Sequence, residues 1–300
     1  MKLSLQIENF IKKGYSFFEA TEIIAKSGFD AMDFSFVRNR YFDETSESEE
    51  FKRELAEIRK VAEEKGMSYN QAHAPFPSNT ADKDFTDKRF VEIVRSMKHA
   101  AMLGIETIVV HPMKIVQEDA TRKLERLFEL NMDFYGRLKP YCEEYGIKVA
   151  VENMWEWKNF CGGRTMTHSA CSTPKDMLRY LDALDRQWFV ACLDIGHALL
   201  LKEEPDEFIR ELGKERLKAL HVHDVACGMF DTHTLPFHGG SGEWDEITAA
   251  LGEIGYDGDF TYEAGNFLNP LPKELFPAAC EYMGHMGRYL VEQIEMKKGE

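Results

Sequence analysis

The chain has 300 residues, with 52 Asp and Glu against 37 Lys and Arg, which gives a formal net charge of −15. This charge disfavours binding to nucleic acid or to anionic membrane surfaces, because both are polyanionic. No segment has the roughly 18 apolar residues of a membrane span, and the start lacks the apolar core of a signal peptide, so a cytoplasmic protein is expected. The six cysteines form no CxxC pair, which favours reduced thiols over disulfides or zinc knuckles.

A local sequence pattern, called the recurring phrase below, repeats along the chain: a charged helical segment, then a glycine, then a short run rich in β-branched and aromatic residues. Examples are "AKSGFDAMDFSF", "EEKGMSYNQAHA", "AMLGIETIVVHP" and "EEYGIKVAVENM". Glycine just past a helix supplies the left-handed conformation of the C-cap, and the run that follows suits a buried strand. Together with "KLSLQI" and "WFVACLDIGH", the phrases predict eight strands, centred near residues 5, 34, 71, 109, 150, 192, 221 and 261.

The spacing of these strands indicates a parallel sheet, since most are separated by about 30 to 40 residues, enough for a crossover helix. Two helix starts are readable. Ser16 and Glu19 form a capping box, and Thr173 before Pro174 is an N-cap followed by proline. We expect one domain over residues 1–300, an α/β fold of the (β/α)₈ TIM barrel type in preference to a doubly wound open sheet. Functional residues should then lie at the strand C-termini.

Six of the eight predicted strands end in a side chain that can bind a metal. These residues are His73, His111, Glu152, Asp194 with His197 nearby, His221 with His223 nearby, and Glu263. One such residue alone is readily a hydrogen-bonded core histidine, but apolar runs that repeatedly deliver a titratable group to one rim predict a polar cavity. Mixed imidazole and carboxylate ligands suit Zn²⁺, Mn²⁺, Fe²⁺ or Co²⁺.

The stretch "LHVHDVACGMFDTHTLPFHGGSGEWD" holds four of the ten histidines. Because side chains alternate along a strand, His221 and His223 point to the same side, and one of the two is expected to bind metal. The loop that follows returns Asp231 and His233 to the site, and "GGSG" is expected to approach the site closely. The alternative is a solvated surface loop.

The segment "WEWKNFCGGRTMTHSACS" is interpreted as a lid loop over the site. Its tryptophans, Trp155 and Trp157, could pack on a sugar ring, and Arg164 could meet an anionic group. The alternative is that both tryptophans belong to the core or to an interface.

The motifs "VEN", "LDIGH", "HVHD", "DTHTLPFHGGSGEWD" and "YEAG", in this order and spacing, resemble the xylose isomerase-like TIM barrel superfamily, in particular its sugar phosphate isomerase/epimerase branch. The resemblance covers essentially the whole chain. It implies one divalent metal ion, Mn²⁺ foremost, with Zn²⁺, Co²⁺, Fe²⁺ and Mg²⁺ as alternatives. Carried over motif by motif, the implied ligands are Glu152, Asp194, His221 and Glu263.

The sequence also resembles endonuclease IV of the same superfamily, which uses three zinc ions. The additional ligand positions that this resemblance implies are matched by His73, His111, His197, Asp231 and His233. Ligand identity therefore does not separate one metal from three. The charge of −15 favours a small-molecule substrate, because DNA binding normally uses Lys and Arg to neutralise phosphates.

The implied activity is isomerisation or epimerisation of a sugar, ketose or sugar phosphate by removal of a proton beside a carbonyl, with Glu152 and Glu263 as acid and base. The expected substrate-binding residues are His73, His111, His197, His223, Asp231, His233, Trp155 and Arg164. "HVHDVACG" lacks the arginine that several ketose epimerases carry there, which is a departure from a simple ketose 3-epimerase. The alternatives are a related lyase or dehydratase acting on inososes or C-glycosides, an endonuclease IV-like phosphodiesterase, and a non-catalytic sugar-binding barrel. Homo-oligomers are common among such barrels.

Overall fold

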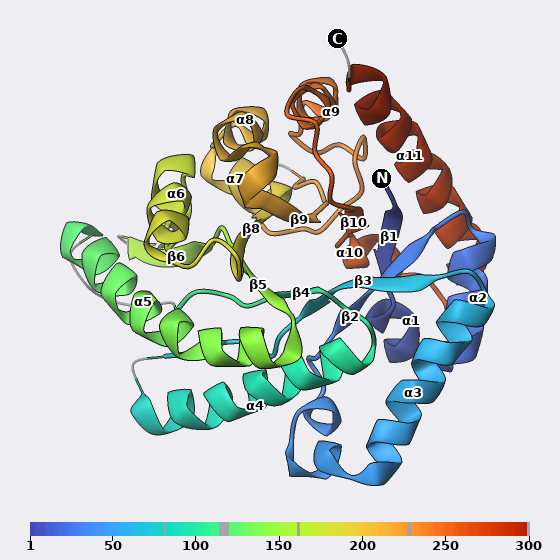
Figure 1. The fold of residues 1–300 in the computed structure, drawn as a ribbon. Coiled ribbons are helices and arrows are strands. Elements are labelled where there is room, and N and C mark those ends of the chain that lie inside the picture. Colours follow the sequence, from blue (N-terminus) through green and yellow to red (C-terminus); the bar gives the residue numbers. More distant parts are fainter. Residues whose placement is uncertain (81, 114–119, 161–162, 227–229, 299–300) are drawn as a thin grey trace.

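The computed structural model describes residues 1–80, 82–113, 120–160, 163–226 and 230–298. Within this part of the chain, eight parallel strands form a sheet in the order β10-β1-β2-β3-β4-β5-β8-β9, with helices on its outside (Figure 1). The strands are β1 (Leu3–Gln6), β2 (Ala31–Ser35), β3 (Ser68–His73), β4 (Thr107–Val109), β5 (Lys148–Glu152), β8 (Phe189–Asp194), β9 (Leu217–His221) and β10 (Phe260–Tyr262). All eight predicted strands are confirmed.

The sheet closes on itself where the chain just beyond β9 meets β10. Val222 pairs with Tyr262 in a parallel bridge, and its amide donates to the carbonyl of Thr261 at 2.8 Å. This closure confirms the (β/α)₈ TIM barrel over the open sheet, and it brings the C-terminal ends of all eight strands to one rim.

Helices separate successive strands and form the outer layer (Figure 1). They are α1 (Glu8–Lys12), α2 (Phe17–Lys26), α3 (Glu49–Glu64), α4 (Lys83–Met102), α5 (Ala120–Tyr145), α6 (Pro174–Ala183), α7 (Ile195–Leu201), α8 (Pro205–Arg216), α9 (Trp244–Glu253), α10 (Gly265–Leu268) and α11 (Phe276–Lys297), with short 3₁₀ turns at Asn39–Tyr41, Glu44–Glu47 and Lys273–Leu275. Among them, no helix of the described residues is both long and apolar enough to cross a membrane.

Local sequence signals explain where several helices begin and end. Ser16 and Glu19 form the predicted capping box of α2, and the hydroxyl of Thr173 accepts from the amide of Asp176 at the start of α6. The glycines of the four quoted segments of the recurring phrase all have positive φ, as the left-handed C-cap requires: Gly28, Gly66, Gly104 and Gly146.

The barrel interior is divided into an apolar and a polar side. On β4, β5, β8 and β9 a separate buried cluster fills the interior: Val109, Ala150, Val190, Cys192 and Ala219. On the other side, Ser4 of β1 donates to the side-chain oxygen of Asn70 at 2.8 Å, and the Asn70 amide donates to the hydroxyl of Thr261 at 3.0 Å. These bonds join non-neighbouring strands, so they run across the interior of the barrel.

An antiparallel hairpin, β6 (Trp155–Phe160) and β7 (Gly163–His168), follows β5. The sequence interpretation of this segment as a loop is therefore wrong for residues 155–160 and 163–168, because their alternating aromatic, threonine and polar residues pair as strands; residues 161 and 162 lie outside the described part. Its role as a lid stays a prediction. Both strands contact α7. Glu156 forms an ion pair with Lys123 of α5, and both side chains are buried. This pair fixes the base of the hairpin against the outer helices.

Candidate metal centre

The C-terminal ends of six strands deliver the predicted titratable residues to one side of the barrel. His73, Glu152, Asp194 and His221 are the last residues of β3, β5, β8 and β9, while Glu263 directly follows β10. All are buried except Glu263, whose side chain is 18% exposed. The strands therefore bring these residues together as the sequence predicted.

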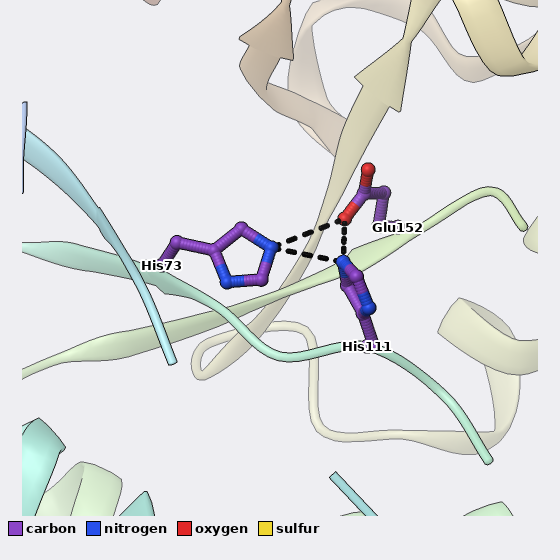
Figure 2. A group of neighbouring side chains, drawn as sticks. All are labelled: His73, His111 and Glu152. Atoms are coloured by element: carbon purple, nitrogen blue, oxygen red, sulfur yellow. Dashed lines mark hydrogen bonds and ion pairs between the residues drawn. The ribbon is translucent and has the colours of Figure 1, made fainter. Parts of the chain in front are cut away.

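The first group of side chains joins β3, the segment after β4, and β5. Nε2 of His111 lies 2.8 Å from Nε2 of His73 and 2.8 Å from Oε2 of Glu152, and the distance from His73 to the same oxygen is 3.8 Å. Figure 2 shows the two imidazole nitrogens and this carboxylate oxygen converging on one point. The three atoms are close enough to share a single cation.

The second group is centred on His221. Its Nδ1 lies 3.2 Å from Oε1 of Glu152, 3.0 Å from Oε2 of Glu263 and 3.9 Å from Oδ2 of Asp194. Ligand atoms of these four residues all lie within 4.8 Å of one another. Glu152 belongs to both groups, because its two oxygens face different histidines.

The third group is centred on Asp231, in the loop that follows β9. Oδ2 of Asp231 is 3.3 Å from Nε2 of His197 and 3.2 Å from Nε2 of His233. His223 connects this group to the second, since its Nε2 is 2.9 Å from Oδ1 of Asp194 and 3.8 Å from Oδ1 of Asp231. The rings of His223 and His233 stack with centroids 4.1 Å apart. Both histidines of the "HVHD" motif therefore lie in the site. His221 belongs to the second group, and His223 belongs to the third.

Backbone carbonyls orient four of these imidazoles. Nδ1 lies at hydrogen-bond distance from a carbonyl oxygen in each case: 2.7 Å for His73 and Ala74, 2.8 Å for His197 and Asn153, 3.3 Å for His223 and Asp224, and 2.8 Å for His233 and Glu263. A carbonyl oxygen only accepts, so Nδ1 carries the proton and donates. Nε2 is then left for the cavity, which is the arrangement that metal-binding histidines normally have.

Buried carboxylates and imidazoles shift one another's pKa values. Although burial opposes its ionisation, the charges of His111 and His221 hold the pKa of Glu152 well below its usual range. Burial also opposes charging of the histidines, yet the carboxylates prevail: Asp194 and Asp231 raise the pKa of His197 to about 9, and Asp231 and Glu263 raise that of His233 to about 10. The carboxylates gathered away from water and the oriented Nε2 atoms form a donor set that fits a divalent metal ion.

Glycines allow the close packing around the site. A Cβ on Gly196 would lie 1.9 Å from Cε1 of His223, so only glycine fits beside that ring. The sequence suggested that the glycine run after His238 approaches the site closely. In the structure this run packs against Asp224, which belongs to none of the three groups. Oδ1 of Asp224 accepts from the amides of Ser241 and Gly242 at 2.9 and 3.1 Å, because a buried carboxylate draws in backbone donors.

A cavity of about 270 Å³ opens onto the three groups. Its described lining consists of His73, Phe76, Pro77, His111, Pro112, Glu152, Met154, Trp155, His197, Asp231, His233 and Glu263. Trp155 lines it as proposed from the sequence, and its ring centroid is 6.4 Å from that of His197. Arg164, in contrast, is exposed on β7 opposite Asn159 and is not among the lining residues. The structure does not bring Arg164 to the site.

Sequence reasoning missed the contributions of β1 and β2, since neither ends in a histidine or glutamate. Gln6 at the end of β1 donates from Nε2 to Oε1 of Glu263 at 3.3 Å. Asp33 of β2 is paired in register with both Gln6 and Gln71, and it is 1% exposed. Asp33 inside a buried strand was the available signal, because an aspartate rarely lies fully buried without a role.

The fold and its gathered imidazoles and carboxylates define a (β/α)₈ barrel with a metal-capable centre at the strand C-termini. The model of the xylose isomerase-like TIM barrel family matches residues 21–283, and the chain belongs to this family.

Two known proteins are similar to the chain in sequence. An uncharacterised protein of Methanocaldococcus jannaschii is 28% identical over 230 residues, which cover 75% of this chain and 74% of that protein. A probable endonuclease 4 of Cenarchaeum symbiosum is 25% identical over 198 residues, 62% of each chain.

Solved structures share the fold. A D-tagatose 3-epimerase-like protein superposes with a TM-score of 0.75 at 24% identity, covering 99% of both chains. The IOLI protein with a bound zinc atom gives a TM-score of 0.73 at 16% identity over 100% of both chains. D-psicose 3-epimerase of Clostridium cellulolyticum H10, with D-tagatose, gives 0.72 at 17% identity, covering 97% of this chain and 99% of that one.

Proposed function

We propose that this protein is a divalent-metal-dependent isomerase or epimerase of a sugar, a ketose or a sugar phosphate. The observation that carries the proposal is that two glutamates from different strands approach the same imidazole nitrogen. Glu152 and Glu263 come from β5 and the end of β10, and their oxygens lie 3.2 and 3.0 Å from Nδ1 of His221. A pure binding protein does not need two carboxylate bases at one metal-capable site.

In this proposal Glu152, Asp194, His221 and Glu263 hold the metal, with Mn²⁺ the first ion to test. The bound ion would act as a Lewis acid that stabilises the negative charge developing on neighbouring substrate oxygens. One glutamate removes a proton from the carbon beside the carbonyl, and the other returns a proton to the enediolate from the opposite face. The low pKa of Glu152 keeps that side chain ionised, as a metal ligand must be.

The remaining cavity residues would bind and orient the substrate. His197 and His233 are held by carbonyls of Asn153 and Glu263, so their Nε2 atoms have fixed directions toward the cavity. His73, His111 and Asp231 line the same cavity, and Trp155 offers an aromatic face to the carbon side of a sugar ring. The buried His223 lies 3.8 Å from Asp231 and would act through it. Sugars named with the solved epimerases, such as D-tagatose and D-fructose, are reasonable first compounds. A lyase or dehydratase that begins with the same proton abstraction is the nearest alternative chemistry.

A second candidate is an endonuclease IV-like phosphodiesterase, and one observation favours it. The described residues form further groups of metal-capable side chains beside the central one, and these include His73 with His111, and Asp231 with His233. A similar protein is called a probable endonuclease 4. The charge of −15 supports the sugar substrate, because a polyanionic DNA strand would meet repulsion.

The deciding experiment combines metal analysis with Glu263→Gln. The amide keeps the size of the side chain and an oxygen but cannot act as a base, so turnover of a ketose substrate at saturating Mn²⁺ should fall by about 10² to 10⁴. Wild-type protein in D₂O should exchange the substrate C–H for deuterium.

Asp194→Ala is the companion variant, and it should lose the metal while the barrel remains folded. One metal per chain with ketose turnover supports the isomerase. Three metals per chain with cleavage of abasic DNA would establish the second candidate instead. Wild-type turnover by Glu263→Gln with metal bound would overturn the two-glutamate mechanism.

A further inference from the structure

Gln6 contacts the centre from a strand that supplies no imidazole or carboxylate to it. Its Nε2 donates to Oε1 of Glu263 at 3.3 Å, while Oε2 of the same carboxylate lies 3.0 Å from Nδ1 of His221. The two oxygens of Glu263 therefore contact different partners, Oε1 the Gln6 amide and Oε2 the His221 imidazole. Rotation of the carboxylate would break both contacts together.

Asn9 determines which way the Gln6 amide points. Nδ2 of Asn9 lies 3.5 Å from Oε1 of Gln6 and 3.5 Å from the Gln6 carbonyl oxygen. If the Gln6 amide were reversed, its oxygen would face the carboxylate of Glu263 and its NH₂ would face the NH₂ of Asn9. Both contacts would be repulsive, so the donor side is directed at Glu263.

The position of Asn9 depends in turn on the chain just after Glu263. Asn9 is 3% exposed in the short helix α1. A Cβ on Gly265 would lie 2.8 Å from Oδ1 of Asn9, so the absence of a side chain there leaves room for the amide. The start of the chain and the segment after β10 therefore fit together around one hydrogen-bonded series, from Asn9 through Gln6 to Glu263.

We propose that Gln6, oriented by Asn9, is a positioning residue that holds Glu263 in the rotamer needed to bind the metal and move a proton. The inference rests on the proposed function of Glu263. Gln6 itself is not a ligand, since its amide nitrogen faces the carboxylate. Loss of an outer partner of a metal-binding carboxylate typically costs about 10- to 100-fold in metal affinity.

The test measures the affinity of the full chain for Mn²⁺ and for Zn²⁺ by competition with a chromophoric chelator, without any substrate. Gln6→Met removes the donor at nearly constant volume, and metal affinity should fall by about 10- to 100-fold. Wild-type affinity in a folded Gln6→Met protein would overturn the inference while leaving the proposed function intact. Absence of Mn²⁺ and Zn²⁺ binding by the wild type would instead refute the proposed function first, and the inference with it.

Asn9→Asp tests the orientation of the amide with an isosteric change. The ionised carboxylate that this substitution introduces can only accept, so the Gln6 amide should turn its NH₂ toward it and present its oxygen to Glu263. We expect a loss of metal affinity as large as that of Gln6→Met, and larger than that of Asn9→Leu. The double variant Gln6→Met/Asn9→Asp should be no weaker than Gln6→Met alone, because Asn9 acts through Gln6. Additive losses would show two independent structural effects and would overturn the relay.

Thr248→Val is the matched control. Thr248 is 3% exposed in α9, and its hydroxyl donates to the carbonyl of Trp244 at 2.8 Å. Its replacement also removes a buried hydrogen bond, so thermal stability should fall while metal affinity stays at the wild-type value. An equal loss of metal affinity in this control would attribute the Gln6 effect to general destabilisation and overturn the proposal.

Discussion

The two sides of the barrel interior solve the same packing problem in different ways. Beneath the metal-capable residues, β4, β5, β8 and β9 present small apolar side chains such as Ala150 and Cys192. Beneath Gln6 and Asp33, the strands on the other side present hydroxyls and amides that bond to one another across the barrel. The apolar side carries most of the proposed metal ligands. Its strands change from buried apolar residues to a titratable residue at their last position, so the ligands lie above an interior without polar groups.

The difference has an energetic meaning. The apolar interior below Glu152 and Asp194 strengthens their electrostatic interactions with His111, His221 and His223. The polar side can hold Glu263 by a neutral donor, Gln6, whose own partner is a second amide. One side therefore supplies ligands and the other supplies orientation. Single substitutions can test this difference by placing a charge on the apolar side or by removing polar groups from the polar side.

The largest effect is expected for Ala150→Asp on the apolar side. Ala150 is fully buried, so the new carboxylate would be an unpaired charge in a dry interior, and stability should fall by about 3–5 kcal/mol. Chemical unfolding measures this loss. Ala150→Asn controls for size, and equal losses in the two variants would show that volume, not charge, limits this side.

An intermediate effect is expected for Asp33→Asn on the polar side. Burial raises the pKa of Asp33 from 3.8 to about 6. The folded protein therefore binds the proton more tightly than the unfolded chain, and Asp33 lowers stability as pH rises from about 4 to 6. Above that window the cost is about 3 kcal/mol, because one pKa unit corresponds to about 1.4 kcal/mol.

Asparagine carries no titratable proton, so the variant should gain stability relative to the wild type between about pH 4 and pH 7. Urea unfolding at several pH values would reveal this. A stability difference between the two proteins that does not change with pH would contradict the buried-carboxylate account.

The smallest effect is expected for Ser4→Ala. The change removes the donor to Oδ1 of Asn70, and a net loss of about 1 kcal/mol follows from one lost hydrogen bond. Ser4→Ala and Thr261→Val should be less than additive in a double-mutant cycle, since both act on the Asn70 amide. Full additivity would mean that the polar side is not a connected network.

The sequence was sufficient for the barrel and for the gathered ligands, because each rests on a local pattern. Glycine after a helix, a short apolar strand and a titratable last residue occur within about a dozen positions, as around Gly146 and Glu152. Strand order then follows from right-handed crossovers between neighbours. Such signals do not depend on contacts between distant segments.

What the sequence could not give are contacts made between segments far apart in the chain. Gln6 and Glu263 are 257 positions apart, and nothing in "KLSLQI" marks Gln6 as a partner of the centre. The hairpin after β5 was missed for a different reason: the glycines of "CGG" suggested a flexible loop, although Trp157 and Met166 pair across a local hairpin. The glycine run was placed near the site because its true partner, Asp224, looked like one more member of a polar strand end.

Glu152 joins two groups of ligands through its two oxygens, and this sharing makes their occupancies thermodynamically linked. A cation beside His73 and His111 draws on Oε2 of the same carboxylate whose Oε1 faces His221. Whatever factor the first cation imposes on the affinity of the second, the second must impose on the first, because coupling free energy is reciprocal. If one cation binds in each group, a titration of the protein with a single metal would show positive or negative cooperativity between the two sites. Replacing Glu152 would weaken binding at both sites and remove the coupling between them.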